Sequence, residues 1–131
     1  MADRNFYQSH QSLEINCVTL WANILIGASG AVTSSSGLGI ASVVKEPNPG
    51  HYIIKLTDSY NKLMWAGITV ENTNGGSPTI SRVHSSNVSN SANPTVEIQL
   101  LDPAAGSNVD ATNGDVLLVK IELRNSSVTN T

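Results

Sequence analysis

Several short stretches of the chain alternate hydrophobic with polar residues, which is the period of a β-strand with one buried face. The first stretch runs from Leu13 to Ile26, and its hydrophobic residues change phase once, between Cys17 and Val18. A phase change of one residue is produced by a bulge or by a corner between two sheets. Helical i, i+4 spacing also fits part of this stretch, but its β-branched residues and its glycine-containing end at 27–30 favour a strand.

Six more stretches are predicted to be strands, most of them because they alternate in the same way. They cover residues 38–44, 51–57, 64–70, 79–84, 96–100 and 116–124. In the first of the six, one face is shared by Leu38, Ile40, Ser42 and Val44. Turns and loops are predicted between the strands, chiefly at 34–37, 47–50, 58–62, 72–76, 85–93 and 102–114. The Pro-rich turn at 47–50 makes its two flanking strands a predicted hairpin.

About seven short strands with no long helix are typical of a compact antiparallel β-sandwich or jelly-roll-like domain. At 131 residues the chain has room for one such domain. We therefore predict an all-β sandwich over residues 13–125, with an extended N-terminal arm at 1–12 and a C-terminal tail at 126–131. The arm is predicted because residues 1–12 show no sustained hydrophobic period.

The composition narrows the choice of partner. Hydrophobic residues make up 40% of the chain and charged residues 13%, which suits a folded core better than a disordered polymer. The formal net charge is -3, so no basic excess is present to neutralise a phosphate backbone, and no nucleic-acid partner is expected.

Neither a signal-peptide pattern nor a membrane-spanning apolar run is found, so no membrane partner is expected. The single cysteine, Cys17, is predicted to be a buried thiol.

No motif positions catalytic or metal-binding groups along the sequence. Serine is abundant, but the G-x-S-x-G elbow of a hydrolase is absent. The histidines, at positions 10, 51 and 84, have no His, Cys or carboxylate at ligand spacing and are interpreted as exposed strand or arm residues. Asp102, Asp110 and Asp115 lie in or beside one loop and could hold calcium, but they do not match the EF-hand pattern. We expect no catalytic residue, no cofactor and no bound metal.

Four aromatic residues are the candidates for an interface. Trp21 and Trp65 are out of phase with the hydrophobic faces of their strands, so their rings are predicted to point outward. They either pack under a loop or in a second layer, or are buried at a protein interface, where tryptophan is enriched. Phe6 and Tyr7 either anchor the arm on a neighbouring molecule or belong to a frayed terminus. The sequence shows no cluster of aromatic residues interleaved with charge, as a lectin would use.

Several segments follow one another in a characteristic order along the chain. They are residues 20–30 leading into AVTSSSGLGI at 31–40, then PGHYIIKL at 49–56, DSYNKL at 58–63, NPTVEIQ at 93–99, ATNGDV at 111–116 and LRNSSV at 123–128. This order resembles small structural proteins of tailed bacteriophages and covers most of the chain from about residue 20 onward.

The resemblance implies a non-enzymatic virion component and, within that class, a capsid decoration (cement) protein with a β-sandwich fold. Such a protein is made in the host cytoplasm, binds the major capsid protein on the outer surface of the head as a homotrimer, and stabilises the head by bridging capsid subunits. The resemblance implies no catalytic residues.

Two other classes of function are left open by the sequence. A phage fibre or receptor-binding module would contact host-surface glycan, and the loops at 72–78, 85–94 and 102–114 are rich in Asn, Ser and Asp that suit sugar hydroxyls. An enzyme is the third class, although no motif positions an acid, a base or a nucleophile. Regular density over the whole shell of a particle would distinguish decoration from fibre attachment.

Overall fold

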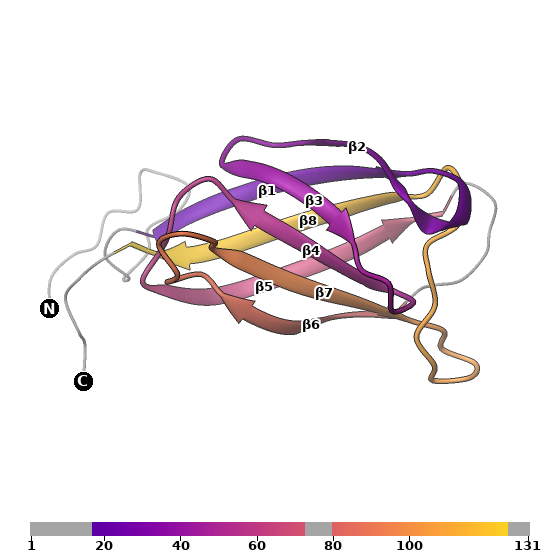
Figure 1. Ribbon diagram of the computed structural model, residues 1–131. Helices are drawn as coiled ribbons and strands as arrows, with labels where there is room; N and C mark the ends of the chain where they lie inside the picture. Colours follow the sequence, from indigo (N-terminus) through magenta and orange to yellow (C-terminus); the bar gives the residue numbers. More distant parts are fainter. Residues whose placement is uncertain (1–16, 73–79, 126–131) are drawn as a thin grey trace, which may run out of the picture.

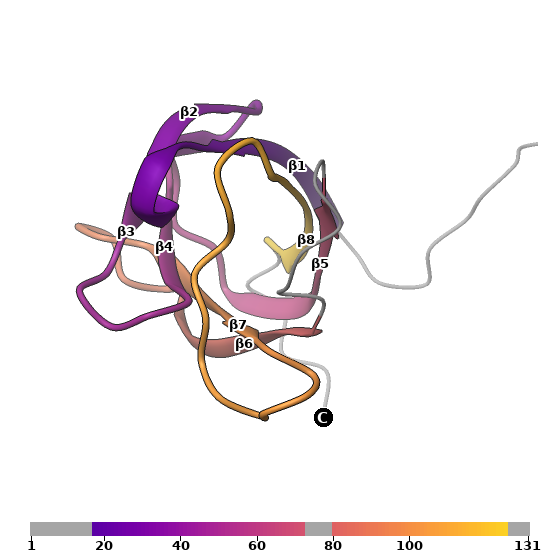
Figure 2. The same cartoon turned by 90° about the vertical axis from the view of Figure 1, so that its right-hand side faces the viewer.

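The chain folds as an all-β sandwich of two four-stranded antiparallel sheets, which confirms the predicted fold class (Figure 1). The structure is a computed structural model and describes residues 17–72 and 80–125. Sheet A has the order β2-β1-β8-β5 and sheet B the order β3-β4-β7-β6. Figure 2 shows the two sheets facing each other across the core. The strands are β1 (Cys17–Ile26), β2 (Val32–Ser36), β3 (Ile40–Lys45), β4 (His51–Leu56), β5 (Lys62–Glu71), β6 (Ile80–Asn87), β7 (Thr95–Leu101) and β8 (Val116–Arg124), with one 3-10 turn, η1 (Ala28–Gly30).

The core is built from alternate residues of the inner strands. On β1, β4, β7 and β8 every second side chain is buried, as the period-two pattern predicts. Side chains from the two sheets meet between the layers and exclude water from both inner faces. The buried residues of these four strands include Leu20, Ala22, Ile24, Ile26, Tyr52, Ile54, Leu56, Val96, Ile98, Leu100, Leu117, Val119, Ile121 and Leu123.

One strand was missed by the sequence pattern. Residues 34–37 were predicted to be a loop, but Val32–Ser36 form β2, which pairs with β1 at one edge of sheet A. None of its five residues is buried, so they show no alternation of hydrophobic and polar side chains. An edge strand of this kind is held by its ladder hydrogen bonds with β1 more than by burial.

The predicted face of β3 is also wrong. Val43 is buried, whereas Val44 is 56% exposed and Leu38 is 92% exposed. The register between β3 and β4 shifts between Ile40 and Ser42. A shift of one residue moves every later side chain to the opposite face, which explains why Val43 rather than Val44 reaches the core.

The sequence predicted a change of hydrophobic phase between Cys17 and Val18, at the start of β1, and the structure does not show one there. The pairing of β1 with β8 runs without a shift from Cys17 to Leu25. Cys17 is exposed rather than buried, because it lies on the outer face of the sheet together with Thr19 and Trp21. The predicted arm at 1–12, with Phe6 and Tyr7, and the tail at 126–131 lie outside the described residues.

Tyr52 of β4 connects the sandwich to the turn η1. Its ring is fully buried, and its hydroxyl donates a hydrogen bond to the carbonyl of Gly30 at 2.8 Å. Burial raises the pKa of Tyr52 to about 12, and the negative charges of Asp110 and Asp115 act in the same direction. The folded protein therefore holds the phenolic proton more tightly than the unfolded chain does.

This difference predicts an alkaline loss of stability. The contribution of Tyr52 is complete below its unfolded pKa of 10.0 and is lost as the pH rises toward about 12. The free energy of unfolding should fall by about 2–3 kcal/mol over that interval from this group alone. Tyr52→Phe cannot ionise, so its stability, measured by urea unfolding, should fall less over the same range, after an initial loss of about 1 kcal/mol from the missing hydrogen bond. Identical pH dependence of the two proteins would contradict the assignment.

Candidate functional site

The outer face of sheet A carries two exposed tryptophans. Trp21 on β1 is 63% exposed and Trp65 on β5 is 52% exposed. The predicted outward orientation of both rings is thus confirmed, and the interpretation that they pack under a loop or a second layer is wrong. Strand β8 lies between β1 and β5, and its Lys120 is paired with Trp21 on one side and with Gly67 on the other.

Gly67 makes room for one of the two rings. A Cβ atom at this position would overlap the six-membered ring of Trp65, so only glycine lets the indole lie across β5. The two tryptophans and Lys120 line an open groove of about 550 Å³ on this face, together with Asn23, Ile68, Thr69 and Leu118. The groove is therefore formed by strands of the rigid sheet rather than by loops.

Lys120 places a positive charge beside the rings of both tryptophans. Its Nζ lies 5.3 Å from the ring centroid of Trp21 and 5.7 Å from that of Trp65, within the range of cation–π attraction. The same Nζ is 3.3 Å from Oε1 of Glu122. Trp21, Trp65 and Lys120 are called the Trp–Lys face below. The sequence did not reveal this cluster because its members come from three different strands.

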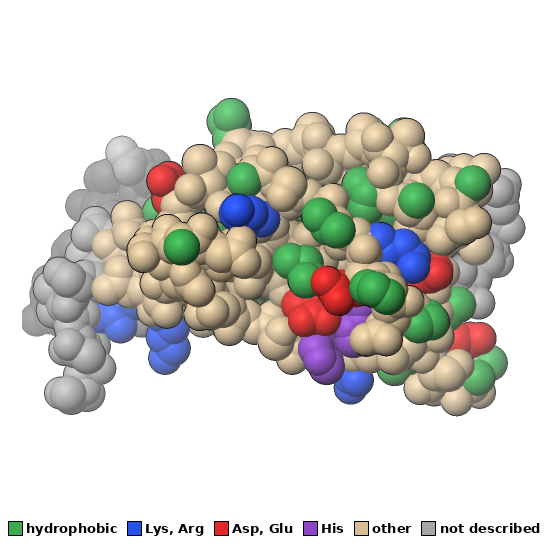
Figure 3. All heavy atoms as spheres, in the orientation of Figure 1, with side chains coloured by type: hydrophobic (Ala, Val, Ile, Leu, Met, Phe, Trp, Pro, Cys, Tyr) green, Lys and Arg blue, Asp and Glu red, His purple; other side chains and the backbone are tan. Residues whose placement is uncertain are grey.

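The outer face of sheet B carries a different, polar cluster, where two histidines lie beside acidic side chains (Figure 3). His51 of β4 is 6% exposed, and its Nδ1 is 2.7 Å from Oε1 of Glu97 on β7. The ring of His84 on β6 meets the His51 ring edge to face, with 4.8 Å between the centroids. The hydrogen bond with His51 is the main reason why the pKa of Glu97 is below its usual value, so this carboxylate is ionised at neutral pH.

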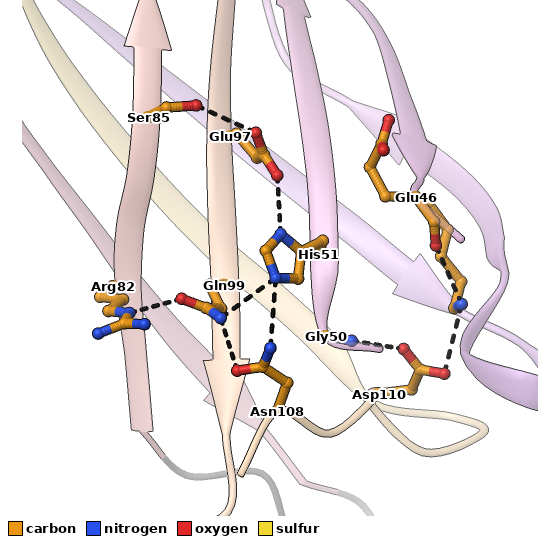
Figure 4. A network of polar contacts seen from close by, with 10 residues as sticks. Glu46, Gly50, His51, Arg82, Ser85, Glu97, Gln99, Asn108 and Asp110 are labelled. Atoms are coloured by element: carbon orange, nitrogen blue, oxygen red, sulfur yellow. Dashed lines mark hydrogen bonds and ion pairs between the residues drawn. The ribbon is translucent and has the colours of Figure 1, made fainter. Parts of the chain in front are cut away.

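A chain of hydrogen bonds determines which nitrogen of His51 carries the proton (Figure 4). Nε of Arg82 can only donate, so the group it meets at 2.6 Å must be the carbonyl oxygen of Gln99. The amide nitrogen of Gln99 then donates to Nε2 of His51 at 3.1 Å. Nε2 is therefore the acceptor, and Nδ1 holds the proton that is donated to Glu97.

A bulge on β6 brings His84 into this cluster. The pairing of β6 with β7 shifts between Val83 and Ser85, which leaves His84 as the additional residue. Such a bulge redirects side chains, and here both His84 and Ser85 contact the cluster on the outer face. With regular alternation these two neighbours would point to opposite faces of the sheet.

The cluster is not arranged as a serine-hydrolase triad. Oγ of Ser85 donates to Oε2 of Glu97 at 3.0 Å, on the opposite side of the carboxylate from His51. A triad requires the hydroxyl at the second ring nitrogen of the histidine. In His51 that nitrogen accepts a hydrogen bond from the Gln99 amide.

Each of the three aspartates named as calcium candidates makes a hydrogen bond or an ion pair within the protein. Asp102 accepts a hydrogen bond from the backbone of Ala104, Asp110 pairs with Lys45 at 3.3 Å, and Asp115 accepts two hydrogen bonds from Thr112. In the part of the chain that the structure describes, the group able to hold a metal with three ligands is formed instead by His51, His84 and Glu97. Spacing along the chain did not indicate this group, because its ligands lie on three strands.

Comparison of the chain with protein-family models, with curated proteins and with solved structures finds no match. Over residues 17–72 and 80–125, no helix is long and apolar enough to cross a membrane.

The four residues predicted to form the interface are accounted for as follows. The structure brings Trp21 and Trp65 to one face, on either side of β8. Phe6 and Tyr7 lie outside the described residues. Lys120 and Gly67 were not predicted. The pairing of β8 with β1 brings Lys120 beside Trp21, and the close approach of Gly67 to the Trp65 ring is seen only in the structure.

Proposed function

We propose that this protein is a non-enzymatic structural component of a tailed-phage virion, a capsid decoration protein that binds the outer surface of the head. The Trp–Lys face carries the proposal, because two tryptophans that are more than half exposed lie together in one open groove on the outer face of sheet A. Tryptophan dominates the binding energy of many protein interfaces through the large area that it buries. The resemblance of the segments from about residue 20 onward supports a virion partner, the major capsid protein.

The proposed mechanism is bridging rather than chemistry. A protein that binds the assembled shell and not its separated subunits stabilises the shell by mass action. The Trp–Lys face would be buried against capsid subunits, and a homotrimer, the assembly implied by the same resemblance, would present three copies of it. Each copy raises the effective concentration of the others at the shell.

Binding to empty heads tests this function. Heads assembled without the protein are mixed with the purified full-length chain, sedimented, and imaged by electron microscopy. Decoration predicts co-sedimentation and regular density over the whole shell. Heads that carry no additional density at saturating protein would exclude the proposal.

The N-terminal arm gives a separate prediction. Deleting residues 1–12, which contain Phe6 and Tyr7, should weaken attachment to heads by about tenfold or more, because a second contact on the same molecule adds avidity. Circular dichroism should show that the sandwich still folds. The double variant Phe6→Ala/Tyr7→Ala, of full length, distinguishes the aromatic anchors from the length of the arm. Equal occupancy of heads by truncated and full-length protein would rule out a role for the arm.

A second candidate function is favoured by the shape of the same face. An open groove with two indole rings, the amide of Asn23 and the hydroxyl of Thr69 offers stacking surfaces and hydrogen-bonding groups, as a glycan requires. In that case the protein would be a fibre or receptor-binding module that contacts host-surface glycan. A shift of tryptophan fluorescence on adding host-surface polysaccharide, without binding to heads, would favour this alternative.

A further inference from the structure

Two imidazoles and one carboxylate converge on the outer face of sheet B. One ligand atom from each of His51, His84 and Glu97 lies within 4.8 Å of the other two. Around a tetrahedral zinc ion, ligand atoms about 2.0–2.1 Å from the metal are roughly 3.3 Å from one another. The ligand atoms of this cluster must therefore come up to about 1.5 Å closer to hold the ion, a movement that the exposed side chain of His84 can make.

We infer that His51, His84 and Glu97 form a binding site for one divalent transition-metal ion of the zinc class. This inference goes beyond the proposed function and does not depend on it. Two imidazole nitrogens and one carboxylate oxygen are a ligand set of zinc sites, whereas calcium and magnesium prefer oxygen ligands alone. Three protein ligands leave the fourth position to water on the solvent side.

The backbone holds the ligands in place. His51, Glu97 and His84 lie on the adjacent strands β4, β7 and β6, and β7 is hydrogen-bonded to both neighbours. Ligands on paired strands are positioned more firmly than ligands on loops. The bulge at His84 is the feature that turns the third ligand toward the other two.

Binding of the ion requires the proton of His51 to change position. The metal takes the place of the proton on Nδ1, so the neutral ring must carry its proton on Nε2. Nε2 then needs an acceptor, and Gln99 cannot provide one because Arg82 holds its carbonyl oxygen. Asn108, whose amide nitrogen is 3.4 Å from Nε2, cannot turn its carbonyl oxygen toward the ring either, because that oxygen accepts a hydrogen bond from the amide nitrogen of Gln99. The Nε2 proton of the metal-bound ring therefore meets no acceptor from Gln99 or Asn108, whereas an aspartate at position 108 would offer one oxygen to Gln99 and the other to Nε2.

His84 distinguishes a metal site from a simple histidine–carboxylate pair. A pair that only stabilises the sheet needs His51 and Glu97, which already share a hydrogen bond of 2.7 Å. His84 is exposed and meets His51 through its ring edge, so replacing it removes a ligand while leaving that bond in place. Loss of metal affinity without loss of stability is thus the specific signature of the site.

Metal titration of the full-length, tag-free chain tests the inference. After treatment with a chelator the protein is titrated with Co²⁺, whose visible absorption reports tetrahedral coordination, and Zn²⁺ is then added in competition. One ion per chain is expected. His84→Ala should weaken binding by at least about tenfold, and His10→Ala, a histidine elsewhere in the chain, should leave it unchanged. Should His84→Ala fail to fold, His84→Gln retains the size of the side chain and is expected to show the same loss.

A variant at position 108 adds a readout that a purely structural role of His51 and Glu97 would not give. Asn108→Asp offers one carboxylate oxygen to the amide of Gln99 and the other to Nε2 of His51, and should bind the metal more tightly than the wild type. Zn²⁺ should raise the melting temperature of the wild type and not that of the His84 variants. Equal affinity of wild type and both His84 variants, or no tetrahedral Co²⁺ spectrum, would overturn the inference.

Discussion

Replacing Trp21 and Trp65 together by alanine is expected to weaken attachment to assembled heads by at least about 100-fold. This factor corresponds to a loss of about 2.7 kcal/mol of binding free energy, which is modest for two tryptophans at the centre of an interface. Both rings are more than half exposed in the separate chain, so their removal should change the free energy of unfolding by less than about 1 kcal/mol. Co-sedimentation over a range of protein concentrations measures the first effect, and urea unfolding measures the second.

Two further variants identify the surface that is responsible. Gly67→Ala retains both tryptophans but displaces the Trp65 ring from β5, and it should weaken attachment by about tenfold if the shape of the groove matters. Val44→Ala removes an exposed hydrophobic side chain of sheet B and should have no effect. If the double tryptophan variant decorates heads like the wild type, the Trp–Lys face is not the surface that binds them.

Gly50→Ala is expected to lower the free energy of unfolding by about 3 kcal/mol. Gly50 has a φ of 74°, where an L-residue is strained. An added Cβ would also lie 2.5 Å from the carbonyl oxygen of Leu100 and 2.8 Å from that of Val109. Both oxygens belong to the backbone, and Leu100 is itself hydrogen-bonded to Gly50, so neither can move away without breaking the pairing of this region.

Gly106→Ala is the matched control for this prediction. Gly106 has a similar φ of 68°, but no atom lies within 4 Å of the position that a Cβ would take. Its replacement should therefore lower the free energy of unfolding by about 1 kcal/mol, the effect of the left-handed backbone alone. Urea unfolding of the two variants under the same conditions gives the comparison. Equal losses would show that close approach of the backbone is not what requires glycine at position 50.

The strands that could be predicted are those with one face in the core. In β1, β4, β7 and β8 the hydrophobic side chains alternate because one side of each strand is covered by the opposite sheet. The edge strand β2 has no buried residue and produced no pattern. In β3 the shift between Ile40 and Ser42 reversed the face, and a bulge of that kind has no signature in the alternation of a short strand.

In the candidate sites, too, local alternation predicted the direction of single side chains but not which side chains lie together. The phase of Trp21 and Trp65 within their strands was enough to predict that both rings point outward, and they do. Their position beside each other and beside Lys120 depends on β8 being inserted between β1 and β5. The three metal-ligand candidates depend in addition on the bulge that turns His84 outward.

By itself the sequence determined the class of fold, the core faces of four strands and the outward direction of the two tryptophans, because each follows from local alternation between a buried and an exposed side. The tertiary structure alone decided which outward-pointing residues meet. Strand order and register are set by pairing between segments far apart in the chain, and that pairing brings Lys120 between Trp21 and Trp65 and places His84 against His51.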